Sequence, residues 1–166
     1  MSASSLFHPL RVRRIEPDTE EAVIVSFDVP PDLRDVFAFN QGQYLTLRTE
    51  VDGADLRRSY SICAGIDDGE LRVAVRKVAG GVFSNWINQR LKRGDEVQVM
   101  PPQGRFFVPL DPTAQRHYLG VAGGSGITPI LSIMKTVLGR EPLSRFTLIY
   151  ANRVAKSTMF KEELED

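Results

Sequence analysis

Hydrophobic and polar residues alternate in short runs over the first hundred positions of the chain. Glycine and proline separate these runs, and alternation between such turn signals is typical of strands in an antiparallel barrel or sandwich. Two helices are expected to interrupt the strands, a short one over 32–36 and a longer one over 82–90. The predicted strands occupy residues 11–16, 22–29, 43–49, 58–63, 71–75 and 97–100.

The pattern changes after residue 112, where continuous apolar runs replace alternation. Residues 117–122 and 146–151 are predicted as buried strands, because parallel strands covered on both faces carry apolar runs. Residues 127–138 have apolar side chains at helical spacing, and another helix is expected over 157–166. This strand–helix–strand–helix order is the opening of a parallel α/β sheet.

Two residues mark the ends of the helix predicted over 127–138. Pro129 lies in its first turn, where proline is tolerated, and Gly139 is placed to end it. We divide the chain into two domains, residues 1–112 and 113–166. The second has too few strands to bury both faces of a doubly wound sheet, so we expect it to be the truncated first part of an α/β domain.

Composition excludes several classes of function. The chain has 21 Lys and Arg residues and 21 Asp and Glu residues, so its net charge is zero. A protein without net positive charge does not attract a polyanion, so nucleic acid is not expected as a partner. A single cysteine, Cys63, cannot form an internal disulfide or hold an iron–sulfur cluster, and no metal site is expected. The chain has no membrane-length apolar run and no secretory signal at its start, so a cytoplasmic protein is expected.

The first candidate motif, Arg58-Ser59-Tyr60-Ser61, lies on a predicted strand. Arginine offers a planar fork of donors for phosphate, and a tyrosine two residues later shares its face of the strand. The tyrosine ring suits stacking on a flat heterocycle, and Ser61 adds a small hydroxyl. An ordinary strand with polar side chains is an equally good interpretation of these four residues taken alone.

Two glycine-rich segments precede predicted helices. Gly80 and Gly81 lead into 82–90, where backbone amides at a helix start can bind an anion, although a simple glycine hinge explains them as well. Residues 121–129 form a strand, a turn with three glycines and a helix start, which is the context of a dinucleotide turn. A tight turn requiring positive φ is the alternative.

Taken in this order, the three motifs resemble the ferredoxin–NADP reductase superfamily, and within it the reductases that serve oxygenases in bacterial phenylacetate degradation. The resemblance covers the whole chain. It implies a six-stranded antiparallel flavin-binding barrel followed by an incomplete NAD(P)-binding α/β domain. The superfamily often has Pro-Gly-Gln where this chain has Gln41-Gly42-Gln43, a small change in a turn.

The resemblance also implies roles for particular residues. Arg58 would hold the FAD pyrophosphate, Tyr60 would stack on the isoalloxazine, and Ser61 and Thr128 would be the catalytic residues where flavin and nicotinamide meet. An arginine at the end of the second strand of a dinucleotide sheet favours NADPH, and Arg153 lies there. The full set of predicted cofactor contacts is Arg58, Ser59, Tyr60, Ser61, Val75, Arg76, Lys77, Gly81, Val82, Phe83, Ser84, Gly124, Ser125, Gly126, Thr128 and Arg153.

The expected function is that of an FAD-dependent oxidoreductase. It would take a hydride from NADPH, or NADH, and pass electrons singly to an iron–sulfur centre in a partner or in another module, serving an oxygenase. One alternative is a flavin-holding electron-transfer or assembly module that does not oxidise pyridine nucleotide itself. A weaker alternative is a non-enzymatic barrel without a cofactor.

Overall fold

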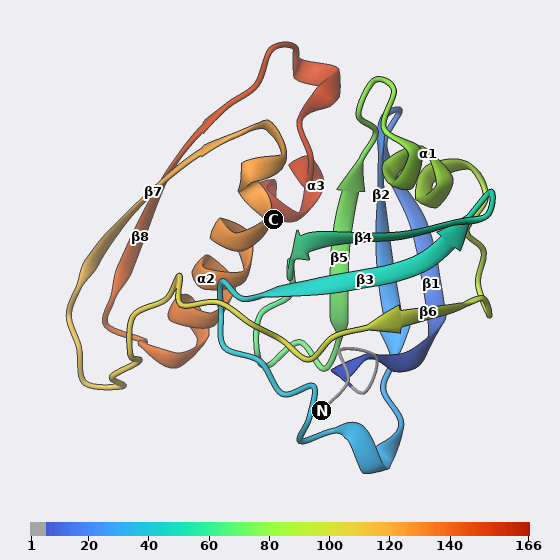
Figure 1. The fold of residues 1–166 in the computed structure, drawn as a ribbon. Coiled ribbons are helices and arrows are strands. Elements are labelled where there is room, and N and C mark those ends of the chain that lie inside the picture. The colour runs from blue at the N-terminus through green and yellow to red at the C-terminus, as the bar shows by residue number, and fades with distance from the viewer. Residues whose placement is uncertain (1–5) are drawn as a thin grey trace.

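An antiparallel sheet forms the first part of the molecule, in a computed structural model that describes residues 6–166. Its strand order is β4-β3-β6-β1-β2-β5, so the six runs of alternating residues are confirmed as strands of one sheet. The sheet is curled (Figure 1). Side chains from its strands form a buried core on the inner side of the curl. The strands are β1 (His8–Thr19), β2 (Ala22–Asp28), β3 (Tyr44–Val51), β4 (Ala54–Ser61), β5 (Leu71–Arg76) and β6 (Glu96–Val99).

The expected barrel is not closed. Strands β4 and β5 stand at the two edges of the sheet, and within residues 6–166 a single isolated bridge, Ile62 to Val73, joins them. Strand β4 ends at Ser61 because the chain then turns toward a helix of the second part, where Ala64 accepts a 2.7 Å hydrogen bond from Ser132. A continuous ladder between the two edge strands therefore cannot form.

Helix α1 (Val82–Gln89) covers one opening of the curled sheet (Figure 1). Its apolar residues Phe83 and Ile87 are buried among the side chains of the strands. Leu45 and Leu47 of β3 and Val73 of β5 are fully buried in the same cluster. The core of this part is thus made by the inward side of each alternating strand plus one face of α1.

The second part pairs two parallel strands, β7 (His117–Gly123) and β8 (Arg145–Ala151), as expected. Helix α2 (Ile127–Arg140) packs between this pair and the antiparallel sheet (Figure 1). A 3₁₀ turn, η3 (Gly124–Gly126), connects β7 to α2. The chain ends with η4 (Ala155–Ser157) and α3 (Lys161–Glu165). No helix among residues 6–166 is long and apolar enough to cross a membrane.

Three predicted helix boundaries are wrong. The helix expected over 32–36 is a single 3₁₀ turn, η2 (Pro31–Leu33). Helix α2 continues through Gly139, which stays in helical geometry because the buried Glu141 ends the helix instead. The last helix begins at Lys161, because Phe160 before it adopts a left-handed conformation (φ 58°) that a continuous helix cannot contain.

The two parts share a buried seam. Cys63, two residues after the end of β4, packs in one cluster with Ile127 and Leu131 of α2. Cys63 is fully buried, and this burial raises the pKa of its thiol to about 12. Polar contacts flank the seam, including the 3.1 Å hydrogen bond from the Ile66 amide to Thr136 and the ion pair between Arg140 and Asp67.

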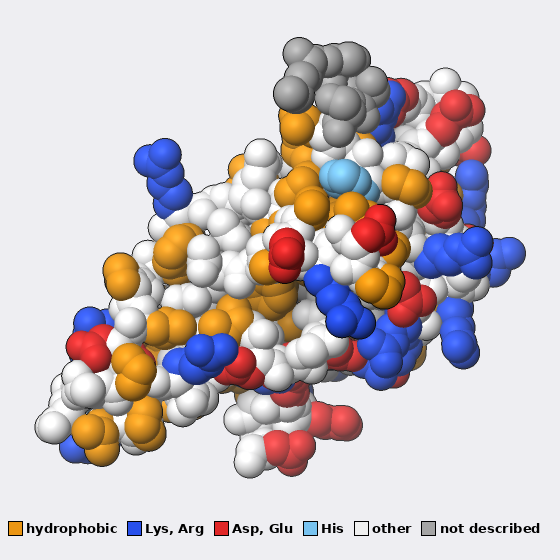
Figure 2. All heavy atoms as spheres, turned by 90° about the horizontal axis from the view of Figure 1, so that it is seen from below, with side chains coloured by type: hydrophobic (Ala, Val, Ile, Leu, Met, Phe, Trp, Pro, Cys, Tyr) orange, Lys and Arg blue, Asp and Glu red, His pale blue; other side chains and the backbone are white. Residues whose placement is uncertain are grey.

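One face of the β7–β8 pair is exposed to solvent. Helix α2 covers the other face, while Leu119, Val121 and Ile149 are 65%, 65% and 54% exposed. Figure 2 shows hydrophobic side chains gathered over the end of the molecule that carries these strands. Basic side chains gather at the opposite end, over the antiparallel sheet. The second part therefore presents an apolar surface in this structure.

Candidate functional site

Strand β4 presents Arg58 and Tyr60 on the same side, as the period of two predicts. Tyr60 stands opposite Leu45 and Arg58 opposite Leu47, and both leucines are fully buried. Both motif residues therefore lie on the inner face of the sheet, at the end of the core. Ser59 lies on the outer face, where its hydroxyl is 2.9 Å from that of Thr46.

The Tyr60 ring is half-buried beside the start of α1. Its centroid lies 6.2 Å from that of Phe83, and burial raises the pKa of its hydroxyl to about 12. One side of the ring packs on the core while the rest faces outward. This is the arrangement that a flat heterocycle would need in order to stack on it.

The guanidinium of Arg58 is exposed and available for an anion. Its Nη1 donates to the carbonyl oxygen of the adjacent Arg57 at 2.6 Å. No ion pair of Arg58 with a carboxylate occurs among residues 6–166. A phosphate near the end of β4 would therefore not compete with an acidic side chain for this arginine.

The start of α1 is held by Ser84 and depends on Gly81. Ser84 is buried, and its Oγ accepts the Val78 amide at 3.1 Å. A Cβ on Gly81 would lie 2.8 Å from that oxygen and 3.1 Å from the Val78 carbonyl, so a larger residue would displace the Ser84 side chain. The amides of residues 82–84 have no acceptor within the helix, as at any helix start. They can bind an anion, whereas the Ser84 hydroxyl supports the loop.

The end of β5 connects the two parts of the site. Arg76 pairs with Glu21 at 3.3 Å, and its Nη1 lies 3.2 Å from where a Cβ of Gly124 would be. Val75 is buried, so only its backbone is near the surface, and its carbonyl accepts from Asn88 at 3.0 Å. The Lys77 side chain donates to the Glu20 carbonyl at 3.3 Å. Arg76 thus reaches the glycine turn, while Val75 and Lys77 are engaged elsewhere.

The turn at 123–126 is held from within the second part. Gly124 has a φ of 52°, and its carbonyl accepts the Tyr150 hydroxyl at 3.1 Å. Thr128 is buried, and its hydroxyl donates to the Ser125 carbonyl at 3.1 Å. The threonine therefore stabilises the turn, and Ser125 and Gly126 are the part of the turn that is exposed to solvent.

The two predicted catalytic residues lie at the same seam. Ser61 ends β4, and Cys63 two residues later shares a buried cluster with Ile127, the neighbour of Thr128. Ser61 is half-buried and stands opposite Tyr44 in the ladder between β3 and β4. The fold therefore brings the end of the Arg58–Ser61 motif next to the start of α2, although the two segments are far apart in sequence.

Arg153 lines a cavity of mixed charge beside the β1–β2 hairpin. This cavity has a volume of about 280 Å³, and Arg76 and Lys156 also line it, facing Glu20 and Glu21. The sequence analysis did not identify Lys156, which lies outside any recognisable motif. It also missed Tyr150 and Asp18, whose contacts with residues 124 and 160 come from the fold alone.

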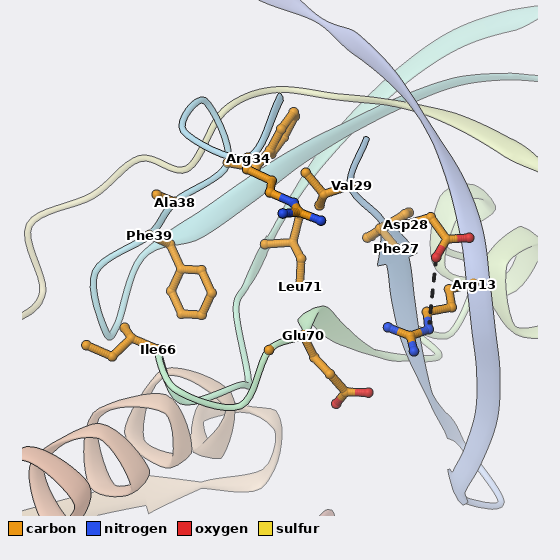
Figure 3. Close-up of a pocket in the computed structure, with 12 residues that line it drawn as sticks. Arg13, Phe27, Asp28, Val29, Arg34, Ala38, Phe39, Ile66, Glu70 and Leu71 are labelled. Carbon is orange, nitrogen blue, oxygen red and sulfur yellow. Dashed lines mark ion pairs between the residues drawn. The ribbon is translucent and has the colours of Figure 1, made fainter. Parts of the chain in front are cut away.

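A second cavity, of about 460 Å³, opens at the far end of the antiparallel sheet (Figure 3). Phe27, Phe39 and Leu71 line it, with Arg34 above them and the Arg13–Asp28 ion pair (3.9 Å) at one side. None of the predicted cofactor residues contributes to it. No group of metal-ligating side chains that could hold an ion occurs among residues 6–166.

Two family models match the chain. The oxidoreductase FAD-binding domain matches residues 9–108, and the oxidoreductase NAD-binding domain matches residues 121–166. The chain therefore belongs to the FAD- and NAD-binding oxidoreductases of the ferredoxin reductase family. These matches bear out FAD and a pyridine nucleotide as the ligands of the two parts.

Individual relatives place the chain more closely. It is 45% identical to a component of the 1,2-phenylacetyl-CoA epoxidase of Escherichia coli (strain K12), over 96% of this chain and 45% of that protein. It is 37% identical to the ferredoxin reductase component of 3-ketosteroid-9-alpha-monooxygenase of Rhodococcus rhodochrous, over 93% of this chain and 44% of that protein. The chain spans about half the length of the curated relatives it matches.

The fold is shared with a solved reductase. The structure of phthalate dioxygenase reductase, described as a modular structure for electron transfer from pyridine nucleotides to [2Fe-2S], superposes with a TM-score of 0.80. The two are 30% identical, over 96% of this chain and 48% of that chain. The predicted architecture, an antiparallel flavin-side sheet followed by a parallel α/β unit, is confirmed apart from the open edge of the sheet.

Proposed function

We propose that the protein oxidises NADPH through FAD and delivers electrons singly to an iron–sulfur centre that serves an oxygenase, in phenylacetate degradation. The observation that carries the proposal is the approach of Arg76, at the end of β5, to Gly124 in the glycine turn. This contact places the strands proposed to bind the flavin next to the turn at 123–126, which is proposed to bind the nucleotide. The relatives, which are components of an epoxidase and of a monooxygenase, support the choice of acceptor.

The residues present fit FAD better than FMN. Arg58 and the amides of residues 82–84 offer two anion sites, which suits a pyrophosphate rather than one phosphate. Gly81 lets the loop close on Ser84 at the helix start, where a Cβ would clash with the Ser84 hydroxyl. Tyr60 would cover the ring system, and Ser61 would offer a hydroxyl at its edge. When bound, FAD would supply the hydride-accepting and one-electron chemistry, and the protein would supply binding and orientation.

The seam between the parts would orient the nucleotide. Thr128 fixes the turn whose amides would meet the nucleotide phosphates, and Ser61 ends β4 at the same seam. Buried apolar side chains there would keep water from the place where the two ring systems meet. We place the domain boundary between residues 112 and 113 and the protein in the cytoplasm.

Nucleotide preference is assigned to Arg153. It lines this cavity beside two ion pairs, Arg76 with Glu21 and Lys156 with Glu20. Among residues 6–166, Arg153 is thus the cation of this cavity that a 2′-phosphate would meet without a carboxylate partner. In the full-length gene product, Arg153→Ala should raise the Michaelis constant for NADPH by about tenfold and change that for NADH little. Steady-state kinetics with both nucleotides measure this. Equal effects on the two would remove Arg153 as the residue that distinguishes them.

The function is tested on the purified full-length gene product. The protein should be yellow, and mass spectrometry of the flavin released by heat should give FAD. Anaerobic addition of NADPH should bleach the flavin absorbance. Release of FMN would contradict the pyrophosphate assignment. A yellow protein that NADPH does not bleach would indicate a flavin-holding module that does not oxidise pyridine nucleotide.

A further inference from the structure

The β1–β2 hairpin of the antiparallel sheet contacts the last residues of the chain. Asp18, near the end of β1, accepts the backbone N–H of Phe160 with both carboxylate oxygens, each 3.1 Å from the nitrogen. The two residues are 142 positions apart in sequence. This carboxylate therefore attaches the segment that follows β8 to the flavin-side sheet.

Phe160 is tightly held at this point. Its φ of 58° is uncommon for a residue with a bulky side chain, and its side chain is 2% exposed. The guanidinium of Arg72 lies 5.6 Å from the centre of its ring, and the same arginine pairs with Glu163 at 2.6 Å. The conformation of the segment is thus fixed by its surroundings on the flavin side rather than by its own backbone preference.

Hydrogen bonds continue from this segment to the glycine turn. Met159 donates its N–H to the Tyr150 hydroxyl oxygen at 3.2 Å, and that hydroxyl donates to the Gly124 carbonyl at 3.1 Å. Asp18 is therefore connected to the turn through Phe160, Met159 and Tyr150. All three links are partly buried, where hydrogen bonds are less exposed to competing water.

We propose that Asp18 is a positioning residue for the pyridine nucleotide and acts through Tyr150 on the turn at 123–126. The inference rests on the proposed function, which puts the nucleotide at this turn. A turn that binds phosphates through backbone amides must hold them in place, since small displacements cost binding and rate. The Asp18 carboxylate accepts from the Phe160 amide and makes no hydrogen bond with Arg58 or Tyr60 among residues 6–166, so its loss should leave FAD binding intact.

Four variants of the full-length gene product test the proposal. Asp18→Ala removes the acceptor, and Asp18→Asn keeps an oxygen that can accept the Phe160 N–H. Tyr150→Phe keeps the ring and removes the hydroxyl that links Met159 to Gly124. Glu16→Ala is the control, because Glu16 lies on the same strand and carries the same charge. Within the described part of the chain, it is paired only with the exposed Arg14, at 3.2 Å.

Three quantities are measured for each variant: the Michaelis constant for NADPH with ferricyanide as acceptor, the dissociation constant of FAD, and hydrogen exchange without nucleotide. Asp18→Ala leaves the Phe160 N–H without its acceptor, and Tyr150→Phe leaves the Gly124 carbonyl without its donor. Because the turn at 123–126 is then held less firmly, each substitution should raise the Michaelis constant for NADPH by about tenfold. Exchange should rise at both 158–160 and 123–126, and FAD affinity should stay the same. Asp18→Asn and Glu16→Ala should behave like the unsubstituted protein, and combining Asp18→Ala with Tyr150→Phe should add little.

An unchanged Michaelis constant for NADPH in a folded Asp18→Ala or Tyr150→Phe protein would overturn the proposal, as would an equal loss of FAD affinity. If Asp18→Ala does not fold, Tyr150→Phe decides the question by the same criterion. Failure of the unsubstituted protein to oxidise NADPH is a different result, because it refutes the proposed function itself. If the unsubstituted protein oxidises NADPH and the variants oxidise it equally well, the proposed function stands and only the role of Asp18 is refuted.

Discussion

The Tyr60 side chain lies half in the core and half at the surface, and this position gives a direct test of the flavin site. If its ring covers the flavin, Tyr60→Ala should weaken FAD binding by about 1 to 3 kcal/mol through lost stacking and burial. Titration of the apoprotein with FAD, followed by flavin fluorescence, measures the change. Tyr60→Phe is the matched control, since it keeps the ring. A folded alanine variant with unchanged affinity would remove Tyr60 from the site.

The placement of a residue in the site was predictable from the sequence where a local pattern determines it. The period of a strand puts Arg58 and Tyr60 on one face, and the ladder with β3 agrees. Ser84 and Thr128 were correctly located at helix starts, yet their hydroxyls bind the Val78 amide and the Ser125 carbonyl of their own turns. The link from Asp18 could not be predicted, because it joins residues that only the complete fold brings together.

At the scale of elements, the end of α2 is organised by a buried carboxylate. Glu141 has no exposed side-chain surface and accepts hydrogen bonds from Tyr118, Ser144, the Asp111 amide and Arg116. Burial opposes its ionisation, but these donors outweigh that effect and lower the pKa of Glu141 below its ordinary value of 4.5. One side chain thus joins the end of α2 to the segment that connects the two parts.

Replacing this carboxylate should destabilise the protein in a pH-dependent way. Glu141→Gln should lower the free energy of unfolding by about 2 to 4 kcal/mol at neutral pH, because buried donors lose a charged acceptor. A lowered pKa in the folded protein means that the contribution is present above 4.5 and is lost as the pH falls through the folded value. Urea unfolding at several pH values measures this. A difference between the two proteins that stays constant down to acid pH would contradict it.

Strands and helices with a regular spacing of hydrophobic residues were predicted correctly, but the positions of their ends were not. Six alternating runs became six strands, because alternation between a core and solvent specifies a strand locally. The start of α3 depends on Phe160, whose left-handed conformation is set by Asp18 and Arg72 from the other part of the molecule. The open edge between β4 and β5 likewise follows from contacts of residue 64 with α2.

For the molecule as a whole, the exposed face of the β7–β8 pair should control whether copies of the chain associate with one another. Leu119 and Ile149 expose apolar surface there, so the chain of residues 1–166 should self-associate as its concentration rises. Replacing both with lysine should keep it monomeric in sedimentation velocity experiments. Leu138→Lys is the control, because that residue is exposed on α2 rather than on the sheet. A monomer at all concentrations without substitution would show that this face does not drive association.

The seam between the two parts also limits how such reductases can recombine. Ala22, Ala74 and Cys63 contribute small side chains from the flavin side, and Ile127 and Leu131 fill the space against them. A chimera that exchanged one half for that of a relative would have to carry both sides of this contact, because close-packed interiors tolerate small changes in volume poorly. The two sides of this contact should therefore be exchanged together in such a chimera.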